Sequence, residues 1–286
     1  MPPKVLLLSH PSKPAVVAAL PEVRHFLATH ATLVGERQTT DQSAIATLPE
    51  ADFAVVLGGD GTILAAARGL VQTGHDTPIL GVNFGKLGFL AEFSQEEMLR
   101  HWHLLASGHY QVRKRLLLQA AVHQGETVLA SGLAMNDATL VAGEPFRMVD
   151  LELRLDPEGA RSGLVQFSGD GVVVCTPSGS TAYNLSAGGP IIAPGTEAFG
   201  ITPLNPHSLA FRPFIVPAST KVELKLLRAN PGSALVLDGI RTQTLCDGMR
   251  VSIARHPRAV RLIQNPERTY WEILSGKLHW AARPQG

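Results

Sequence analysis

The sequence predicts an α/β, Rossmann-like nucleotide-binding domain followed by an all-β domain. The first third alternates short apolar runs with stretches of helical spacing, a pattern typical of βαβ units. Beyond about Tyr110 the apolar runs are short and separated by Gly, Pro and Asp turns, which favours antiparallel strands. We expect the α/β domain over residues 1–112 and the β-rich domain over 113–267. A C-terminal helix within 268–286 is placed so that it can pack back on the first domain.

Local patterns define the expected elements. In the α/β part, strands are expected at 5–9, 32–35, 53–57 and 79–82, with helices at 15–29, 62–72 and 94–105. Ser94 and Glu97 form a capping-box pattern at the start of the last of these helices. The expected strands of the second part are 116–122, 128–134, 149–155, 172–176, 222–227, 235–237 and 251–254, before a final helix at 269–280.

Composition limits the classes of function. The 286 residues are 45% hydrophobic and 17% charged, which is typical of a folded protein with a substantial core. A formal net charge of +1 gives no global field for nucleic acid or an anionic membrane, so neither partner is expected. The two cysteines, Cys175 and Cys246, form no CxxC pair, and neither a zinc site nor a disulfide framework is expected. Without an apolar run of spanning length, the expected location is the cytoplasm.

A glycine turn after the strand at 53–57 predicts a phosphate site. Gly-Gly-Asp-Gly (58–61) leads directly into a helix, so backbone N–H groups and the positive end of the helix dipole point at one place. Glycine lets a ligand approach closely and adopts the backbone angles of such anion nests. The residues expected to bind phosphate are Gly58, Gly59, Gly61 and Thr62.

Asp60 adds a carboxylate beside that anion. An acid next to a phosphate fits phosphoryl transfer, in which Asp60 acts as a base toward the attacking hydroxyl, as a Mg²⁺ ligand, or as both in turn. The alternative is an ordinary tight turn in which Asp-Gly is favoured. The motif indicates a kinase without naming the acceptor.

The segment 170–190, DGVVVCTPSGSTAYNLSAGGP, carries a second pattern. An apolar strand leads into a turn with four hydroxyl residues, one tyrosine and then two adjacent glycines. Hydroxyls and exposed backbone suit the edge of a base, and the ring of Tyr183 offers it a face. The alternative is a Ser/Gly-rich surface loop in which Tyr183 is an ordinary packing residue.

This segment resembles the NAD kinase signature, in which DG, a strand, TPTGSTAY and SAGGPI follow one another. Lipid kinases and phosphofructokinases share GGDG but lack this signature. Other segments resemble the family in the same order: NFGKLGFL (83–90), ND (136–137), PHSL (206–209), RP (212–213) and LSGKLHW (274–280). The likeness runs from about residue 50 to residue 280.

The resemblance implies an enzyme that phosphorylates the 2′-hydroxyl of the adenosine ribose of NAD. It makes Asp60 the catalytic residue, and it implies the following NAD-binding residues: Asp60, Gly61, Asn136, Asp137, Arg147, Ser168, Asp170, Thr181, Ala182, Tyr183, Asn184, Leu185 and Ser186. It further implies a β-sandwich second domain, an active site in the crevice between the domains, and a homodimer or homotetramer. The implied donor is ATP or polyphosphate. Mg²⁺ is expected mainly on the nucleotide, without a metal site of the protein's own.

Three departures and two rival functions qualify this interpretation. Asp137 is one methylene shorter than the usual Glu, Ser168 stands where many bacterial members have Arg, and Ile240 replaces a frequent Gln. A diacylglycerol-type lipid kinase is one rival, and the 170–190 segment argues against it. A non-catalytic NAD(H) sensor that kept the fold is the other.

Overall fold

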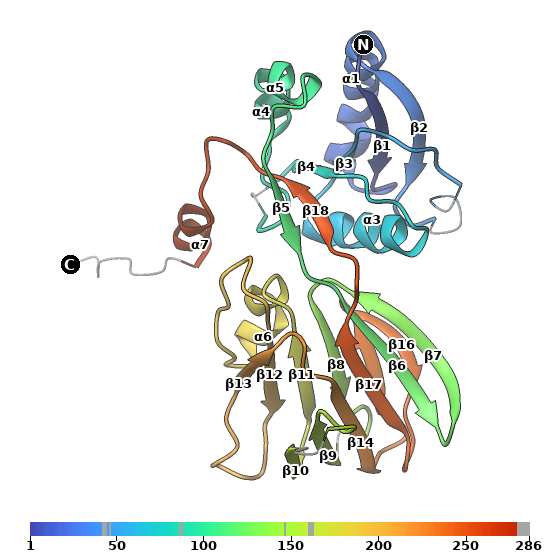
Figure 1. Ribbon diagram of the computed structural model, residues 1–286, viewed down its shortest axis with the longest axis vertical. Coiled ribbons are helices and arrows are strands. Elements are labelled where there is room, and N and C mark those ends of the chain that lie inside the picture. Colours follow the sequence, from blue (N-terminus) through green and yellow to red (C-terminus); the bar gives the residue numbers. More distant parts are fainter. Residues whose placement is uncertain (42–44, 46, 86–87, 146, 160–162, 279–286) are drawn as a thin grey trace, which may run out of the picture. The chain divides into compact units, whose positions relative to one another are not determined.

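The computed structural model separates into two compact units, one of Met1–Lys114 with Val260–Gly286 and one of Arg115–Ala259 (Figure 1). We refer to them as the N-terminal and C-terminal units. The structure describes residues 1–41, 45, 47–85, 88–145, 147–159 and 163–278. No helix in these residues is both long and apolar enough to cross a bilayer.

A six-stranded sheet forms the centre of the N-terminal unit. Its order is β2 (Thr32–Gln38), β1 (Lys4–Ser9), β3 (Phe53–Leu57), β4 (Ile79–Val82), β18 (Val260–Ile263) and β5 (Val112–Arg115). The pairs β1–β2, β1–β3, β3–β4 and β4–β18 are parallel. Parallel strands that start at one edge end at the opposite one, so the residues that follow β1, β3, β4 and β18 gather at one edge of the sheet.

Helices cover the buried strands of this sheet because both of its faces are apolar. One core joins Val55 and Leu57 of β3 to α1 (Pro14–His30) and α5 (Trp102–Ala106). Ala54 and Val56 point to the other face and are 0% exposed, and α3 (Asp60–Gln72) contacts the same strand. The remaining helices are α4 (Gln95–Arg100) and α7 (Tyr270–Leu278).

The helix expected at 94–105 is divided in two at His101. Ser94 and Glu97 form the expected capping box at the start of α4. At His101 the backbone leaves helical geometry, with φ −91° and ψ 7°, and its Nε2 lies 3.0 Å from Glu267 Oε1. α5 then begins at Trp102. The apolar spacing predicted helical structure correctly, but the prediction of one continuous helix was wrong.

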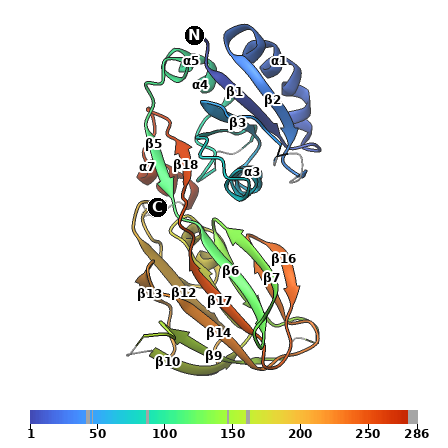
Figure 2. The ribbon, with the colours of Figure 1, turned by 45° about the vertical axis from the view of Figure 1, so that its right-hand side comes forward.

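The C-terminal unit consists of two six-stranded sheets whose pairings are antiparallel (Figure 2). The first has the order β10 (Gly163–Gly169), β9 (Val149–Leu155), β14 (Val222–Arg228), β17 (Arg250–Arg255), β6 (Leu118–Gln124) and β7 (Thr127–Ala134). The second has the order β13 (Phe214–Pro217), β12 (Ala198–Leu204), β11 (Gly171–Cys175), β8 (Asp137–Val141), β15 (Ala234–Leu237) and β16 (Ile240–Thr244).

A single apolar core lies between these two sheets. Val122 and Leu224 from the first sheet belong to the same buried cluster as Val174, Ile201 and Leu235 from the second. Two sheets that share one core form a β-sandwich, which confirms the expected fold of this unit. After β11 the chain forms a short 3₁₀ helix, η1 (Gly179–Thr181), and the single turn α6 (Tyr183–Ser186).

Candidate active site

The glycine turn lies at the amino end of α3, directly after β3. Gly59 is the N-cap residue and Asp60 is the first residue of the helix. The N–H of Gly58 donates to the carbonyl of Val82 and that of Thr62 to the carbonyl of Gly59, each at 2.9 Å. Among the described residues, the N–H groups left for an anion are those of Gly59, Asp60 and Gly61. Thr62 is 2% exposed, and its Oγ1 has no hydrogen-bond partner among the residues that the structure describes. Thr62 is one of the residues expected to bind phosphate, and its buried hydroxyl packs against Gly58.

Lys13 lies beside this turn, and the sequence patterns did not identify it. A β-carbon built on Gly59 would lie 3.3 Å from Lys13 Nζ and 3.8 Å from Asn83 Oδ1. Lys13 is the N-cap residue of α1, shortly after β1, and Asn83 directly follows β4. Since β1, β3 and β4 are parallel neighbours, residues at their carboxyl ends are brought together. This topological rule was the signal that could have pointed to Lys13.

Both carboxylate oxygens of Asp60 accept hydrogen bonds from the backbone of one loop. The N–H of Phe89 lies 2.8 Å from Oδ2, and the N–H groups of Leu90 and Ala91 each lie 3.1 Å from Oδ1. Three donors fix the position of the carboxylate more firmly than a single contact does. The segment that resembles a family motif, NFGKLGFL (83–90), therefore holds the carboxylate of the Gly-Gly-Asp-Gly turn.

Gly88 is required for this contact. A β-carbon at position 88 would lie 1.7 Å from Asp60 Oδ1, well inside van der Waals distance. Its own N–H donates to the carbonyl of Ala91 at 3.3 Å, which closes the loop on itself. Lys86 and Leu87 of the same motif lie outside the described residues, as does Trp280 of the C-terminal motif.

In the C-terminal unit, Asn136 and Asp137 pack against the turn that follows β11. The N–H of Thr176 donates to the carbonyl of Asn136 at 2.8 Å, and Thr176 Oγ1 donates to the carbonyl of Met135 at 2.5 Å. A β-carbon on Gly179 would lie 2.0 Å from Asn136 O, so only glycine permits this approach. Two segments about forty residues apart in the sequence thus form one piece of structure.

Asp238 fixes the same pair from the other side, and sequence reasoning missed this role. Its carboxylate accepts the N–H groups of Met135, Asn136 and Asp137 at 3.0, 2.7 and 3.2 Å. Its own N–H donates to the carbonyl of Asp137 at 3.0 Å. Asp238 has a φ of 47°, a left-handed conformation that Asp adopts more readily than most residues. The sequence offered one signal here, an Asp-Gly pair between two apolar runs. That pair predicts a turn but not a carboxylate that accepts three N–H groups.

Asp137 is a buried acid with few hydrogen-bond donors. It is 5% exposed, and Thr139 Oγ1 donates to its Oδ1 at 3.0 Å. Burial raises the pKa of Asp137 to about 6, the Thr139 hydroxyl lowers it, and the nearby charge of Asp238 raises it. The same surroundings raise the pKa of the Cys175 thiol to about 12, mainly through burial and partly through the charge of Asp137. Cys175 is therefore an inert core residue.

The hydroxyls of the 170–190 segment differ from the expectation that they read the edge of a base. Thr176 and Ser180 are 0% exposed. Ser180 Oγ donates to the carbonyl of Pro177 at 2.7 Å and accepts the N–H of Ile192 at 3.0 Å. These side chains hold the turn together from inside, because a buried hydroxyl must find its partners within the protein.

Asn184 has a similar internal role. It is 0% exposed, its Nδ2 donates to the carbonyls of Ser180 and Pro190, and its Oδ1 accepts the hydroxyl of Thr202 at 2.7 Å. The side-chain amide is fully used inside the protein. Its contribution to a ligand site is to position α6, whose other residues are partly or fully exposed.

A cavity of about 390 Å³ lies beside this turn within the C-terminal unit. Asp170, Tyr183 and Ser186 line it together with the aliphatic side chains of Val141 and Leu204. Tyr183 is 47% exposed, so its ring is available to a ligand. Asp170 Oδ2 accepts a hydrogen bond from Asn205 Nδ2 at 2.8 Å, which orients the acid at the cavity wall.

Other residues expected at the site do not line this cavity. Ser168 donates to Asp150 Oδ1 at 2.6 Å, and Arg147 is exposed, with its backbone carbonyl accepting from Asn230. Ile240 is 55% exposed. Thr181, Ala182 and Leu185 are partly buried within the turn itself, and Gly61 is exposed on α3.

Comparison with known proteins identifies the family. The ATP-NAD kinase N-terminal domain matches residues 8–110, and the ATP-NAD kinase C-terminal domain matches residues 135–265. The chain is 36% identical to an NAD kinase of Rhodopirellula baltica over 284 residues, which cover 99% of this chain and 88% of that protein. It is 40% identical to an NAD kinase of Geobacter metallireducens over 233 residues, covering 82% and 80%.

Solved structures agree on the fold. A yeast NADH kinase complexed with NADH has a TM-score of 0.85 at 23% identity, covering 99% of this chain and 89% of that one. An NAD kinase from Archaeoglobus fulgidus in complex with ATP has a TM-score of 0.72 at 23% identity, covering 96% and 98%. Both domain matches and the extent of the sequence identity confirm the resemblance noted above, and the chain belongs to the NAD kinase family of phosphotransferases.

Proposed function

We propose a division of roles for the NAD kinase reaction of this chain, in which ATP phosphorylates the 2′-hydroxyl of the adenosine ribose of NAD. The glycine turn with Asp60 and Lys13 acts on the phosphoryl group, and the C-terminal unit binds the dinucleotide. The observation that carries this assignment is the Asp60 carboxylate, held by three N–H groups at the amino end of α3. An acid fixed within an anion-binding turn is suited to placing a hydroxyl against a phosphate.

The chemistry needs positioning more than strong basicity. The ribose oxygen attacks the terminal phosphorus, the bond from that phosphorus to the ADP oxygen breaks, and the hydroxyl proton passes to Asp60 or to the transferred phosphate. Because the transition state is largely loose, little proton transfer is required before attack. The N–H groups of the turn and the Lys13 ammonium balance the negative charge of the phosphoryl oxygens.

We assign substrate binding to the residues expected from the sequence. Asp137 accepts hydrogen bonds from ribose hydroxyls, and Asn136 supplies an amide beside it. Tyr183 and Ser186 meet the adenosine half, and Asp170 meets the nicotinamide half. Thr181, Ala182, Asn184 and Leu185 shape the turn, while Arg147 and Ser168 contact the dinucleotide at the rim.

The donor and the metal ion are part of the same proposal. ATP fits the family, and polyphosphate remains an alternative donor. Mg²⁺ would be held mainly by the phosphate oxygens of the donor, and the Asp60 carboxylate, a hard oxygen ligand, would be the contribution of this chain. A homodimer or homotetramer is proposed from the family resemblance alone, as is a cytoplasmic location.

A coupled assay tests the proposed roles directly. Glucose-6-phosphate dehydrogenase reduces any NADP formed, so absorbance reports turnover with NAD or NADH and with ATP or polyphosphate. We expect Asp60→Asn to lower kcat about 1000-fold while the affinity for NAD changes little. Asp52→Asn is a matched control, because Asp52 lies before the amino end of the same strand, where its Oδ2 accepts the N–H of Lys4 at 2.7 Å.

The two rival functions predict different outcomes. A non-catalytic NAD(H) sensor binds NAD in calorimetry but forms no NADP with ATP and Mg²⁺. A lipid kinase phosphorylates dispersed diacylglycerol and leaves NAD unchanged. NADP formation that persists in Asp60→Asn at the wild-type rate would refute the role of Asp60 but leave the activity intact.

A further inference from the structure

A second cavity lies in the N-terminal unit, away from the glycine turn. It has a volume of about 480 Å³, within the range of about 300–1,000 Å³ typical of small-molecule sites. Its walls come from α5, the start of β5 and the segment between β18 and α7. No role assigned above uses this cavity.

The lining combines aromatic surface with positive charge. Phe93, Tyr110 and Trp271 contribute rings, and Trp271 is 56% exposed. The described residues that line the cavity include two arginines and two histidines but no Asp or Glu. Aromatic walls with a few convergent polar groups are typical of sites for small organic ligands, and the surplus of cationic side chains favours an anion.

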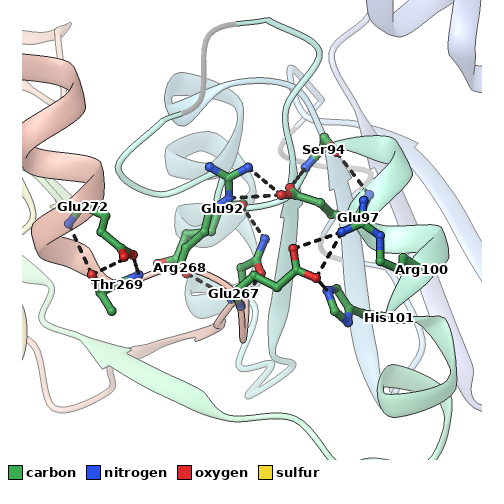
Figure 3. Close-up of polar contacts among 10 residues, drawn as sticks. Glu92, Ser94, Glu97, Arg100, His101, Glu267, Arg268, Thr269 and Glu272 are labelled. Atoms are coloured by element: carbon green, nitrogen blue, oxygen red, sulfur yellow. Dashed lines mark hydrogen bonds and ion pairs between the residues drawn. The ribbon is translucent and has the colours of Figure 1, made fainter.

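Two of the four basic side chains already have a carboxylate partner. Arg268 pairs with Glu97, whose side chain is 9% exposed, and His101 pairs with Glu267 at 3.0 Å (Figure 3). Arg100 pairs with Glu267 as well, at 3.1 Å. Glu97 and Glu267 thus hold the surrounding segments together through these pairs.

The other two basic groups face the cavity without a carboxylate among the described residues. With the Gln264 side-chain amide oriented so that its oxygen faces Arg113, that oxygen accepts from Nε at 2.9 Å and from Nη2 at 2.5 Å, which leaves Nη1 for another acceptor. His109 Nδ1 lies 2.9 Å from Ser107 Oγ. A neutral amide satisfies the geometry of the guanidinium but not its charge.

Hydrogen bonds behind the cavity hold its shape. Asn265 donates from its backbone N–H to Glu92 Oε2 and from Nδ2 to Glu92 O, both at 3.1 Å. Thr269 and Glu272 bond reciprocally at the start of α7, which fixes the turn that carries Trp271 (Figure 3). A cavity with rigid walls loses little conformational entropy when a ligand binds.

We propose that this cavity binds a small organic anion with an aromatic body. The guanidinium of Arg113 binds the carboxylate, phosphate or sulfonate group, and the rings of Tyr110 and Trp271 contact the aromatic part. The Nη1 group of Arg113 donates to the anion, and because the guanidinium is positively charged this hydrogen bond is charge-assisted. The proposal concerns a binding site in the N-terminal unit and does not depend on the residue roles proposed for NAD phosphorylation.

Two fluorescent probes that differ in charge test the proposal. Anilinonaphthalene sulfonate (ANS) is an aromatic anion, and N-phenyl-1-naphthylamine has the same rings without the sulfonate. Each is titrated into the full chain, and the part of the signal that is lost in Arg113→Ala is assigned to this cavity. Arg113→Ala is compared with Arg258→Ala, which removes the same charge from a residue outside this cavity.

We expect Arg113→Ala to weaken ANS binding at least tenfold and to leave the neutral probe within twofold of wild type. Arg258→Ala changes neither. Trp271→Ala, at an exposed position that folding tolerates, weakens both probes. Equal ANS affinity in wild type and Arg113→Ala, or equal losses in Arg113→Ala and Arg258→Ala, would overturn the proposal. Thermal midpoints of all three variants within a few degrees of wild type establish that any loss arises at the site.

Discussion

Asp60 in the N-terminal unit and Asp238 in the C-terminal unit are held by the same hydrogen-bond arrangement. Each carboxylate accepts three consecutive backbone N–H groups, from Phe89–Ala91 in one case and from Met135–Asp137 in the other. The surroundings differ. Asp60 lies at the amino end of a helix with Lys13 nearby, whereas Asp238 lies between two strands and adjoins the buried Asp137.

The comparison of Asp60 with Asp238 shows what three backbone N–H donors contribute by themselves. Three N–H donors fix a carboxylate in place, but they do not make it a catalytic group. In the proposed function, the fixed position of Asp60 at the amino end of α3 serves phosphoryl transfer, whereas Asp238, next to Asp137, organises the site proposed for NAD. Asp137 is the contrasting case, because with one hydroxyl donor and little exposure its pKa rises to about 6.

Changing Gly88 tests whether Asp60 depends on its loop. In Gly88→Ala the new β-carbon would meet Asp60 Oδ1 at 1.7 Å, so the acid and the loop must separate. We expect kcat to fall about 100-fold, because small misplacements of a positioned group cost about this much, and NAD affinity to stay within about threefold. Steady-state kinetics and calorimetry measure the two quantities.

Gly276→Ala is the matched control for that substitution. Gly276 lies in α7 with an ordinary φ, and a β-carbon added there would meet no heavy atom within 4 Å. Its replacement is expected to leave kcat unchanged. A Gly88→Ala enzyme that keeps wild-type kcat would show that Asp60 acts without the loop.

Removing the second carboxylate tests the organising role of Asp238. In Asp238→Ala, three N–H groups next to Asp137 lose their acceptor, and we expect NAD affinity to fall about 30-fold and the free energy of unfolding to fall about 2 kcal/mol. Calorimetry and denaturant unfolding measure these effects. Asp247→Ala is the control, because Asp247 accepts one N–H, from Ala229, in an exposed turn. Equal effects in both variants would contradict a special role for Asp238.

Much of the fold followed from local pattern, but several strands were missed, including the buried strands β8 and β12 of the second sheet. Buried strands such as β1 and β3, with four and five apolar residues in succession, were predicted from the sequence. β16 and β5 were not, because Ile240–Thr244 and Val112–Arg115 are short, largely polar edge strands. β18 was missed because its partner β4 lies nearly two hundred residues earlier, a pairing that local sequence does not encode.

The site shows the same division between local and distant information. Asp60, Asp137 and Tyr183 lie in motifs that can be read as continuous segments. Lys13 and Asp238 act on those motifs from other strands, so only the pairing of the sheets brings them into place. The buried roles of Thr176, Ser180 and Asn184 were also hidden, because a sequence shows that a residue is polar but not whether water reaches it.

Asp137 provides a test by pH. Because its folded pKa of about 6 lies above the reference of 3.8, the folded state binds the proton more tightly. This carboxyl therefore favours folding below the unfolded pKa, and the contribution is lost as pH rises through about 6. Relative to wild type, Asp137→Asn should gain about 1.4 kcal/mol of stability between pH 5 and pH 8, since the Thr139 contact can be kept. Denaturant unfolding at both pH values measures the gain.

The same ionisation predicts how NAD binds. An ionised Asp137 accepts ribose hydroxyls better than a protonated one, so the KM for NAD in wild type should fall as pH rises through about 6, by up to about tenfold. Asp137→Asn should bind NAD more weakly at pH 8 and lose this pH dependence. A KM that varies with pH equally in both proteins would assign the titration to another group.

Lys13 is expected to give the smallest effect, because its ammonium is partly exposed and screened. Lys13→Met should raise the KM for ATP about fivefold, a loss of about 1 kcal/mol, with a smaller change in kcat and none in NAD affinity. Lys4→Met, at the opposite end of β1, is the control. An electrostatic contact with phosphate weakens in salt. Raising the ionic strength should therefore reduce the difference in the KM for ATP between wild type and Lys13→Met. A difference in KM that does not depend on salt would mean that Lys13 supports the turn by packing rather than by charge.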